Sequence, residues 1–148
     1  LILSRQGLPF IGRTDEQIAA IRKGAYVISE AQGSVAVAII IATGSEVDLA
    51  IKAQAELATK GTHVRVVSMP STNVFDRQDQ DYKDSILTPG VKRIAVEAGV
   101  TDFWRKYVGL EGDVVGIDTF GESAPGGDVM KHFGFTVENV VNHVESSL

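Results

Sequence analysis

Cysteine is absent from this 148-residue sequence, which excludes disulfide bonds and thiolate chemistry and fits a reducing compartment. No run of about eighteen apolar residues occurs, so we expect no membrane span. A basic stripe is also missing, because 14 scattered basic residues stand against 19 acidic ones and give a net charge of −5. Proteins that hold a phosphate backbone usually cluster Lys and Arg, so we expect no nucleic-acid partner.

An initiator methionine is lacking as well. The chain begins at Leu1, and its first three residues are apolar but too few for a signal-peptide core. We therefore expect a piece of a longer protein. An apolar content of 44% and the absence of low-complexity runs indicate one folded domain over residues 1–148.

The stretch from residue 35 to residue 69 organises the predicted fold. Val35–Ala42 is apolar without alternation, which is typical of a strand covered on both faces. Helical spacing follows up to Lys60 and Gly61, and Val64–Val67 predicts the next strand. Two strands joined by a crossover helix form a right-handed parallel unit.

The rest of the chain continues the alternation of strands and helices. Thr14 and Gln17 predict a capping box that opens a short helix, closed by Lys23 and Gly24. We expect the strand at 25–29 to pair antiparallel with the strand that begins at Val35, because too few residues separate them for a crossover. Further strands are expected at 92–97 and 114–117, and further helices at 81–87, 102–108, 128–133 and from 136 onward. The predicted fold is three-layer α/β/α, with a mostly parallel sheet and one antiparallel strand.

Residues 43–46 form the first candidate site, a turn from a strand into a helix. Either Thr43 with Glu46 or Ser45 with Asp48 has the spacing of a helix cap. The free N–H groups at Gly44 and Ser45 suit an anion, but the turn lacks both the dinucleotide glycine spacing and the Walker lysine. We favour a structural turn and keep both residues as anion-site candidates. If Gly44 and Ser45 bound an anion, the chain would have an alternative function as a free-standing regulatory module that binds an anion or a nucleotide.

Other polar residues give weaker signals. His63, His132 and His143 share no metal-ligand spacing, and neither a catalytic residue nor a metal site is predicted. Glu97 ends a predicted strand at the edge where open α/β sheets bind ligands, but no catalytic partner is evident, so we favour a cap or an ion pair. Arg5 lies two residues before Gly7, and its guanidinium can bind a phosphate through two parallel hydrogen bonds, although an arginine exposed to solvent is the interpretation favoured by physical reasoning alone.

Three aromatic residues, Phe103, Trp104 and Tyr107, stand on one short predicted helix. They suit either a core or an interface, and we favour an interface because aromatic side chains dominate binding hot spots.

Several sequence blocks in the same order resemble the C-terminal domain of bacterial-type transketolases, over essentially the whole chain. These blocks are Leu3–Gln6, Gly24–Val27, Ala42–Val47, Arg65–Pro70, Phe75–Gln78, Val96–Gly99, Trp104–Gly109, Thr119–Pro125 and Phe133–Thr136. The Ser-Arg-Gln and Phe-Gly-Glu-Ser-Ala-Pro blocks speak against the related terminal domain of 2-oxo acid dehydrogenase β-subunits.

The resemblance implies a cytoplasmic homodimer that moves a two-carbon ketol unit between sugar phosphates in the pentose phosphate pathway. It implies thiamine diphosphate and Mg²⁺ (or Ca²⁺) as cofactors, held by two other domains that are not present here. This chain alone would then bind no cofactor and be inactive. Its partners would be those domains and a second subunit, with residues 1–13 approximating the connecting segment.

The resemblance also implies a five-stranded mixed sheet, and it assigns one functional residue. Arg5 matches the arginine of the family's Ser-Arg-Gln block, which helps to hold the terminal phosphate of the substrate. Gly7 stands where many relatives have Asn, a departure that leaves the arginine in place.

Overall fold

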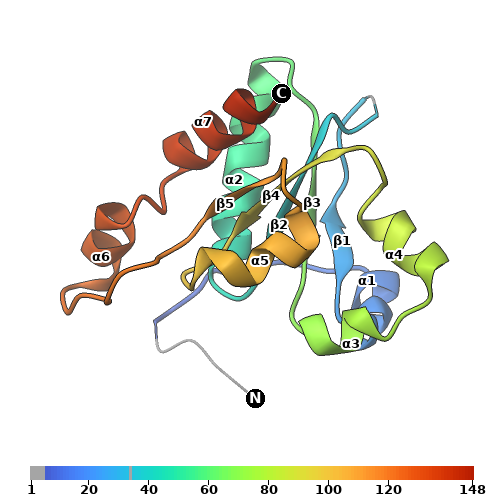
Figure 1. Cartoon of the computed structure of the whole chain (residues 1–148), viewed down its shortest axis with the longest axis horizontal. Helices are drawn as coiled ribbons and strands as arrows, with labels where there is room; N and C mark the ends of the chain where they lie inside the picture. The colour runs from blue at the N-terminus through green and yellow to red at the C-terminus, as the bar shows by residue number, and fades with distance from the viewer. Residues whose placement is uncertain (1–5, 34) are drawn as a thin grey trace.

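The computed structural model describes residues 6–33 and 35–148. The strands are β1 (Tyr26–Ser29), β2 (Ala38–Ala42), β3 (Val64–Ser68), β4 (Lys92–Val96) and β5 (Asp113–Val115). The helices are α1 (Asp15–Ala20), the 3₁₀ turn η1 (Ile21–Lys23), α2 (Glu46–Thr59), α3 (Thr72–Asp76), α4 (Gln80–Ile86), α5 (Thr101–Val108), α6 (Gly126–His132) and α7 (Val137–Ser147). Together they form the three-layer arrangement in Figure 1.

The sheet has five strands in the order β1-β3-β2-β4-β5, and only β1 runs antiparallel. β2 is central, and all five of its residues are buried. Ile40 points into one core, and Ile39 and Ile41 point into the other. The expected mixed sheet with one antiparallel strand is confirmed.

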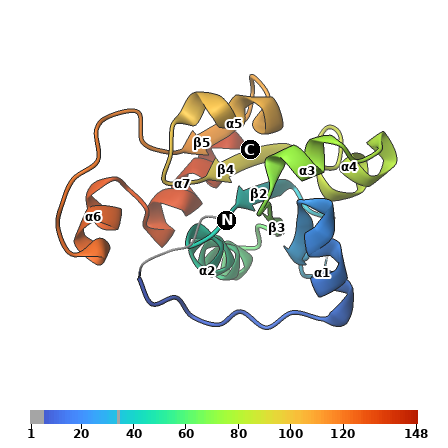
Figure 2. The same cartoon turned by 90° about the horizontal axis from the view of Figure 1, so that it is seen from below.

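Each face of the sheet is covered by its own set of helices. α2 and α7 pack on the face that holds Ile40, while α3, α4 and α5 cover the face that holds Ile39 and Ile41. Figure 2 shows α2 on one side of the sheet and α3, α4 and α5 on the other. None of the helices in these described ranges combines the length and apolarity needed to span a bilayer.

Two details of the predicted sheet are wrong. The strand expected at Val35–Ala42 begins only at Ala38, and Val35 is 85% exposed. The ladder with both neighbouring strands starts at Ala38, although the Val37 N–H still donates to the His63 carbonyl oxygen at 2.9 Å. β1 pairs with β3 and not with β2, because β3 and β4 already occupy both edges of β2.

Local capping was predicted correctly at α1. The hydroxyl of Thr14 accepts from the Gln17 backbone N–H at 3.3 Å, and the Gln17 side chain accepts from the Thr14 N–H at 3.1 Å. Gln17 also donates its amide to the carbonyl oxygens of Val27 and Ile28, at 3.0 Å each. The cap therefore also fastens α1 to the edge strand β1.

Candidate functional site

The parallel strands β2, β3, β4 and β5 all end at one edge of the sheet, which we call the C-terminal edge. Gly44 and Ser45 follow β2, and Glu97 follows the neighbouring strand β4, so three sequence-predicted candidates lie on this edge. Ligands of open α/β sheets bind at such edges. Arg5, the predicted phosphate contact, lies outside the described residues.

Gly44 and Ser45 form the turn into α2. Gly44 has a φ of 55°, a left-handed conformation that suits a residue without a Cβ. Ser45 is the N-cap residue, but its hydroxyl donates to the Glu46 carboxylate at 2.9 Å and caps no backbone N–H. Thr43 accepts the Glu46 N–H through its carbonyl oxygen at 3.2 Å. Both predicted side-chain caps, Thr43 with Glu46 and Ser45 with Asp48, are therefore wrong, because the Glu46 N–H bonds the Thr43 carbonyl oxygen and the Ser45 hydroxyl bonds the Glu46 carboxylate.

The first turn of α2 is acidic, since it carries Glu46 and Asp48. Their carboxylates already neutralise the positive end of the helix dipole, and an incoming phosphate would meet like charge. This geometry argues against the anion-binding module. A titration with phosphate and nucleotides, followed through the backbone NMR shifts of Gly44 and Ser45, tests it directly.

A hollow of about 170 Å³ separates this turn from residues 6–13, which we call the N-terminal arm. Arg13 lines the hollow, but its guanidinium is engaged elsewhere. It donates to the Tyr26 hydroxyl at 2.6 Å and to the Ile11 carbonyl oxygen at 2.8 Å. Arg13 therefore holds the arm against β1 rather than presenting its charge to a ligand.

Glu97 lies against another carboxyl group, that of Glu46. Burial and this neighbour raise the pKa of Glu97 to about 7. Its Oε2 atom is buried and has no hydrogen-bond partner among the described residues. The expected cap or ion pair is therefore not what surrounds Glu97. Sequence reasoning missed Glu46, although two acids that closely follow adjacent parallel strands are a usable signal.

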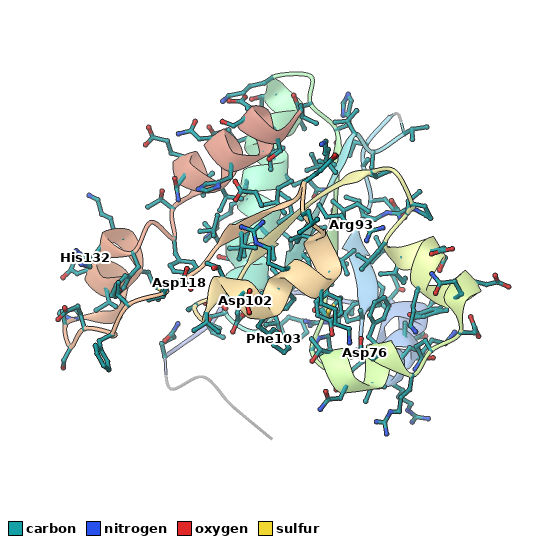
Figure 3. The ribbon with its side chains drawn as sticks, viewed as in Figure 1. Asp76, Arg93, Asp102, Phe103, Asp118 and His132 are labelled. Carbon is teal, nitrogen blue, oxygen red and sulfur yellow. The ribbon has the colours of Figure 1, made fainter. Side chains whose placement is uncertain are left out.

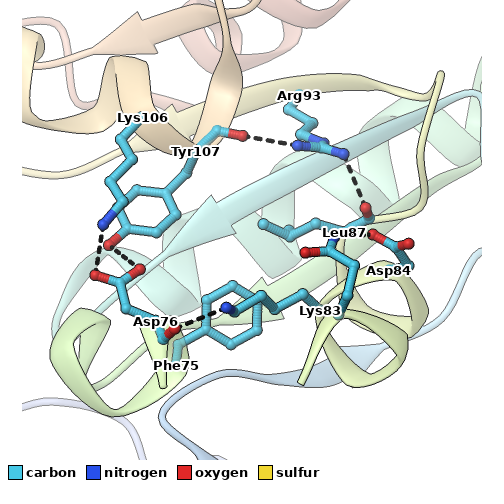
Figure 4. A pocket seen from close by; sticks show the side chains of 9 residues that line it. Phe75, Asp76, Lys83, Asp84, Leu87, Arg93, Lys106 and Tyr107 are labelled. Carbon is cyan, nitrogen blue, oxygen red and sulfur yellow. Dashed lines mark hydrogen bonds and ion pairs between the residues drawn. The ribbon is translucent and has the colours of Figure 1, made fainter. Parts of the chain in front are cut away.

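On the face covered by α3, α4 and α5, a pocket of about 230 Å³ contains several charged side chains (Figure 4). Asp76 accepts from Lys106 at 2.6 Å and from the Tyr107 hydroxyl at 3.1 Å. The hydrogen bond from Lys106 is the largest cause of the lowered pKa of Asp76. Arg93 donates to the carbonyl oxygens of Tyr107 at 3.1 Å and of Leu87 at 2.8 Å. Asp76 therefore joins α3 to α5, and Arg93 joins β4 to α5 and to the end of α4, so these charged side chains hold the fold together.

The aromatic cluster on α5 divides between core and surface. Trp104 and Tyr107 are 3% and 5% exposed and belong to the core, so the predicted interface is wrong for them. Helical spacing turns both rings toward the sheet. Phe103 is 52% exposed near the start of α5 and remains available to a partner (Figure 3).

The histidines do not come together. Nδ1 of His143 lies 2.5 Å from Oδ2 of Asp113, a contact that fastens α7 to β5. Within residues 6–33 and 35–148, no group of three or more His, Cys, Asp or Glu side chains is arranged to hold a metal ion.

Comparison with known proteins shows which family shares this architecture. A family model described as "Transketolase-like TK C-terminal domain" matches residues 24–136. The chain is 54% identical to transketolase 1 of Aliivibrio fischeri and 53% identical to transketolase 2 of Vibrio parahaemolyticus, over all of this chain and 22% of each relative. It therefore spans about a fifth of the length of these relatives.

Solved structures agree with the sequence relatives. Transketolase from Leishmania mexicana has a TM-score of 0.79 and 40% identity, over 88% of this chain and 19% of that one. Transketolase from Pichia stipitis in complex with sedoheptulose 7-phosphate has a TM-score of 0.83 and 36% identity, over 97% of this chain and 20% of that one. The chain thus belongs to the family of transketolase C-terminal domains.

Proposed function

We propose that this chain works as the C-terminal domain of an enzyme that transfers a two-carbon ketol unit between sugar phosphates, with thiamine diphosphate and a divalent metal as cofactors. The observation that carries the proposal is the family match over residues 24–136, together with relatives about five times as long. The similar Pichia stipitis enzyme holds sedoheptulose 7-phosphate, a substrate of the proposed class. The enzyme would act as a cytoplasmic homodimer.

The cofactors would be held outside this chain. The described residues provide no cluster of metal-ligating side chains, and the sequence lacks a diphosphate-binding motif. The residues present do not fit thiamine diphosphate and its metal, so no chemical step is assigned to them. The remaining four-fifths of the enzyme would supply these ligands.

The role of this chain would be to contribute contact surface at the C-terminal edge. Apolar side chains with no cover gather there on three segments. Phe10 of the N-terminal arm is 92% exposed, Val100 and Phe103 around the start of α5 are 60% and 52% exposed, and Phe120 after β5 is 98% exposed. Figure 1 shows the arm, the start of α5 and the loop after β5 on the same side of the molecule, in the lower part of the view. In the proposed enzyme a preceding domain would cover this side, and it is the occupant that we propose.

One site residue would act on the substrate. Arg5, the match to the family's phosphate-holding arginine, lies in the segment that would join this domain to the preceding one. Its guanidinium would make charge-assisted hydrogen bonds to the terminal phosphate of the sugar.

The test joins this chain to the part of Aliivibrio fischeri transketolase 1 that it does not match. We expect the joined protein to transfer ketol units from a ketose phosphate when thiamine diphosphate and Mg²⁺ are present, while the 148-residue chain alone does not. An inactive joined protein that folds and dimerises would contradict the proposal. Micromolar binding of thiamine diphosphate by the isolated chain in calorimetry would contradict the placement of the cofactor.

A matched pair of variants tests the contact surface. In the joined protein, Phe120→Asp places a charge on the C-terminal edge, and we expect weaker domain association and lower activity. Leu110→Asp is the control, because Leu110 is 97% exposed in the turn before β5, at the opposite edge of the sheet. Equal effects of the two variants would show that the C-terminal edge is not the contact surface.

A further inference from the structure

Two acidic residues follow the neighbouring strands β2 and β4 at the C-terminal edge. Ala42 of β2 pairs with Val96 of β4, Glu97 is the next residue, and Glu46 opens α2 after a three-residue turn. The strand register places the two acids at adjacent strand ends, and each shifts the pKa of the other's carboxyl group. Glu46 is only 4% exposed, and Oε2 of Glu97 is fully buried.

When two neighbouring carboxylates are largely shielded from water, burial and mutual repulsion both disfavour the state in which both are charged. Hydrogen bonding between them also requires a proton, because an ionised carboxylate is only an acceptor. The Ser45 hydroxyl donates to Oε1 of Glu46, but among the described residues no donor is found for Oε2 of Glu97. A proton shared between the two groups satisfies this oxygen and removes one of the charges.

The charged groups on the surrounding elements are committed to other partners. On α2, Asp48 pairs with Lys52 at 2.6 Å. From the N-terminal arm, Arg13 donates to Tyr26 and Ile11. After β5, Asp118 accepts from the backbone N–H and the hydroxyl of Thr101 at 2.8 and 2.7 Å.

In the part of the chain that the structure describes, the elements farther away have charged groups that are acidic or already engaged, such as Arg105 of α5, which donates to the Gly112 carbonyl oxygen at 2.7 Å. Asp102 follows Thr101 in the first turn of α5, and it would add negative charge. On α7, His143 contacts the carboxylate of Asp113 on β5, and Glu138 in the first turn of the helix is a further acidic residue. The basic residue of β3, Arg65, pairs with Glu30 at 3.0 Å. Lys92 and Arg93 begin β4 at its other end.

We propose that Glu46 and Glu97 share one proton at neutral pH and thereby form a pH-sensitive latch between the start of α2 and the end of β4. Ionisation of both groups places two negative charges side by side in a buried site. The latch then opens, and the turns at residues 43–45 and 97–100 separate. Both turns belong to the C-terminal edge, so alkaline pH loosens the edge that faces the rest of the enzyme under the proposed function.

The direction of the pH effect follows from the raised pKa of Glu97. A carboxyl group whose folded-state pKa is raised contributes stability that is complete below its unfolded value of 4.5 and is lost as the pH rises to about 7. In this window the folded chain binds more protons than the unfolded chain, so rising pH favours unfolding. A shift from 4.5 to about 7 corresponds to a change of up to roughly 300-fold in the unfolding equilibrium constant.

The test is urea unfolding of the 148-residue chain between pH 5 and pH 8.5. Glu97→Gln supplies a permanent amide donor to Glu46 and mimics the protonated pair. The unfolding equilibrium constant of the wild type should rise with pH over this range, and we expect that rise to be at least about ten-fold smaller for Glu97→Gln. Above pH 7 we expect Glu97→Gln to be more stable than the wild type. Glu122→Gln is the matched control, because Glu122 is exposed on a loop and the substitution changes the net charge equally. Parallel pH profiles for the wild type, Glu122→Gln and Glu97→Gln would overturn the proposal.

A second measurement needs no variant. The side-chain carboxyl carbons of Glu46 and Glu97, followed by NMR in the wild-type chain, should show a common titration step near pH 7, because coupled groups titrate as a pair. Separate titration of both near the ordinary value of 4.5 would refute the shared proton even if Glu97→Gln failed to fold.

Discussion

Gly24 is the backbone position where a single added carbon should cost most. It has a φ of +88° at the end of η1, just before β1. A Cβ at this residue would lie 2.4 Å from the backbone nitrogen of Phe75 and 2.4 Å from the carbonyl oxygen of Ser71. The Ser71 N–H also donates to the Gly24 carbonyl oxygen at 3.0 Å. The start of α3 is therefore packed directly on Gly24.

The cost of Gly24→Ala has two parts, and Gly61 separates them. Gly61 has a φ of +79° and nothing within 4 Å of an added Cβ, so Gly61→Ala measures the left-handed backbone alone, about 1–2 kcal/mol. Gly24→Ala carries the same backbone cost and must also displace the backbone of α3, which adds about 1–3 kcal/mol by analogy with overpacking. The loss of unfolded-state freedom on going from Gly to Ala opposes both costs by about 0.4–1 kcal/mol and cancels between the variants.

Urea unfolding monitored by Trp104 fluorescence and by far-UV circular dichroism provides the assay. We expect Gly24→Ala to be the less stable variant by about 1–3 kcal/mol, with an unchanged denaturant slope for Gly61→Ala. Equal losses for the two variants would refute the close approach of α3 to Gly24. A stabilising Gly24→Ala would refute the left-handed turn as well.

Three further predictions address the core, an ion pair and the substrate. Ile40→Ala should lower the free energy of unfolding by ~2–5 kcal/mol, because it empties a fully buried site on the central strand. A loss below about 1 kcal/mol in urea unfolding would contradict the placement of Ile40 on that strand. Burial raises the pKa of Asp113, but hydrogen bonds from His143 and the Val114 N–H outweigh it and leave the pKa below 3.8. Asp113→Asn should therefore lower Tm at pH 6, and the difference should shrink as the pH falls below 3.8 and through this lowered pKa. A difference in Tm that does not change with pH would contradict the ion pair. In the joined enzyme, Arg5→Ala should lower kcat/KM for phosphorylated substrates by roughly 10- to 150-fold, mainly by raising KM. The activity on unphosphorylated substrates should be nearly unaffected. Equal losses on both kinds of substrate would show that Arg5 does not contact the phosphate.

Short-range patterns in the sequence predicted local structure well. The capping box at Thr14 and Gln17 depends on residues three positions apart, and the unbroken apolar run that contains β2 indicated a strand covered on both faces. Both signals arise from physics that acts within one helical turn or one strand. The mixed sheet followed from the alternation of such elements.

The partner of β1 could not be predicted in the same way. Proximity along the chain favoured β2, but pairing is a competition among all strands for the edges of a sheet. β3 and β4 occupy both edges of β2 over its full length, from Ala38 to Ala42, and only the outer edge of β3 remains for β1. That outcome depends on strands that lie far downstream, so a local argument misses it.

At the candidate site too, some features depend on neighbouring residues in the sequence and others on strands that lie far apart in it. The rule that ligands bind at the carboxyl ends of parallel strands singled out Glu97, but the sequence favoured a cap or an ion pair there, and the structure shows neither. The rule for helix starts assigned Glu46 to a cap, because acids are common in a first turn. What neither rule contains is that β2 and β4 are neighbours, which brings these two acids into contact. A carboxyl pair of this kind becomes visible in a sequence only after the strand order is known, so the search for such sites should follow the topology rather than precede it.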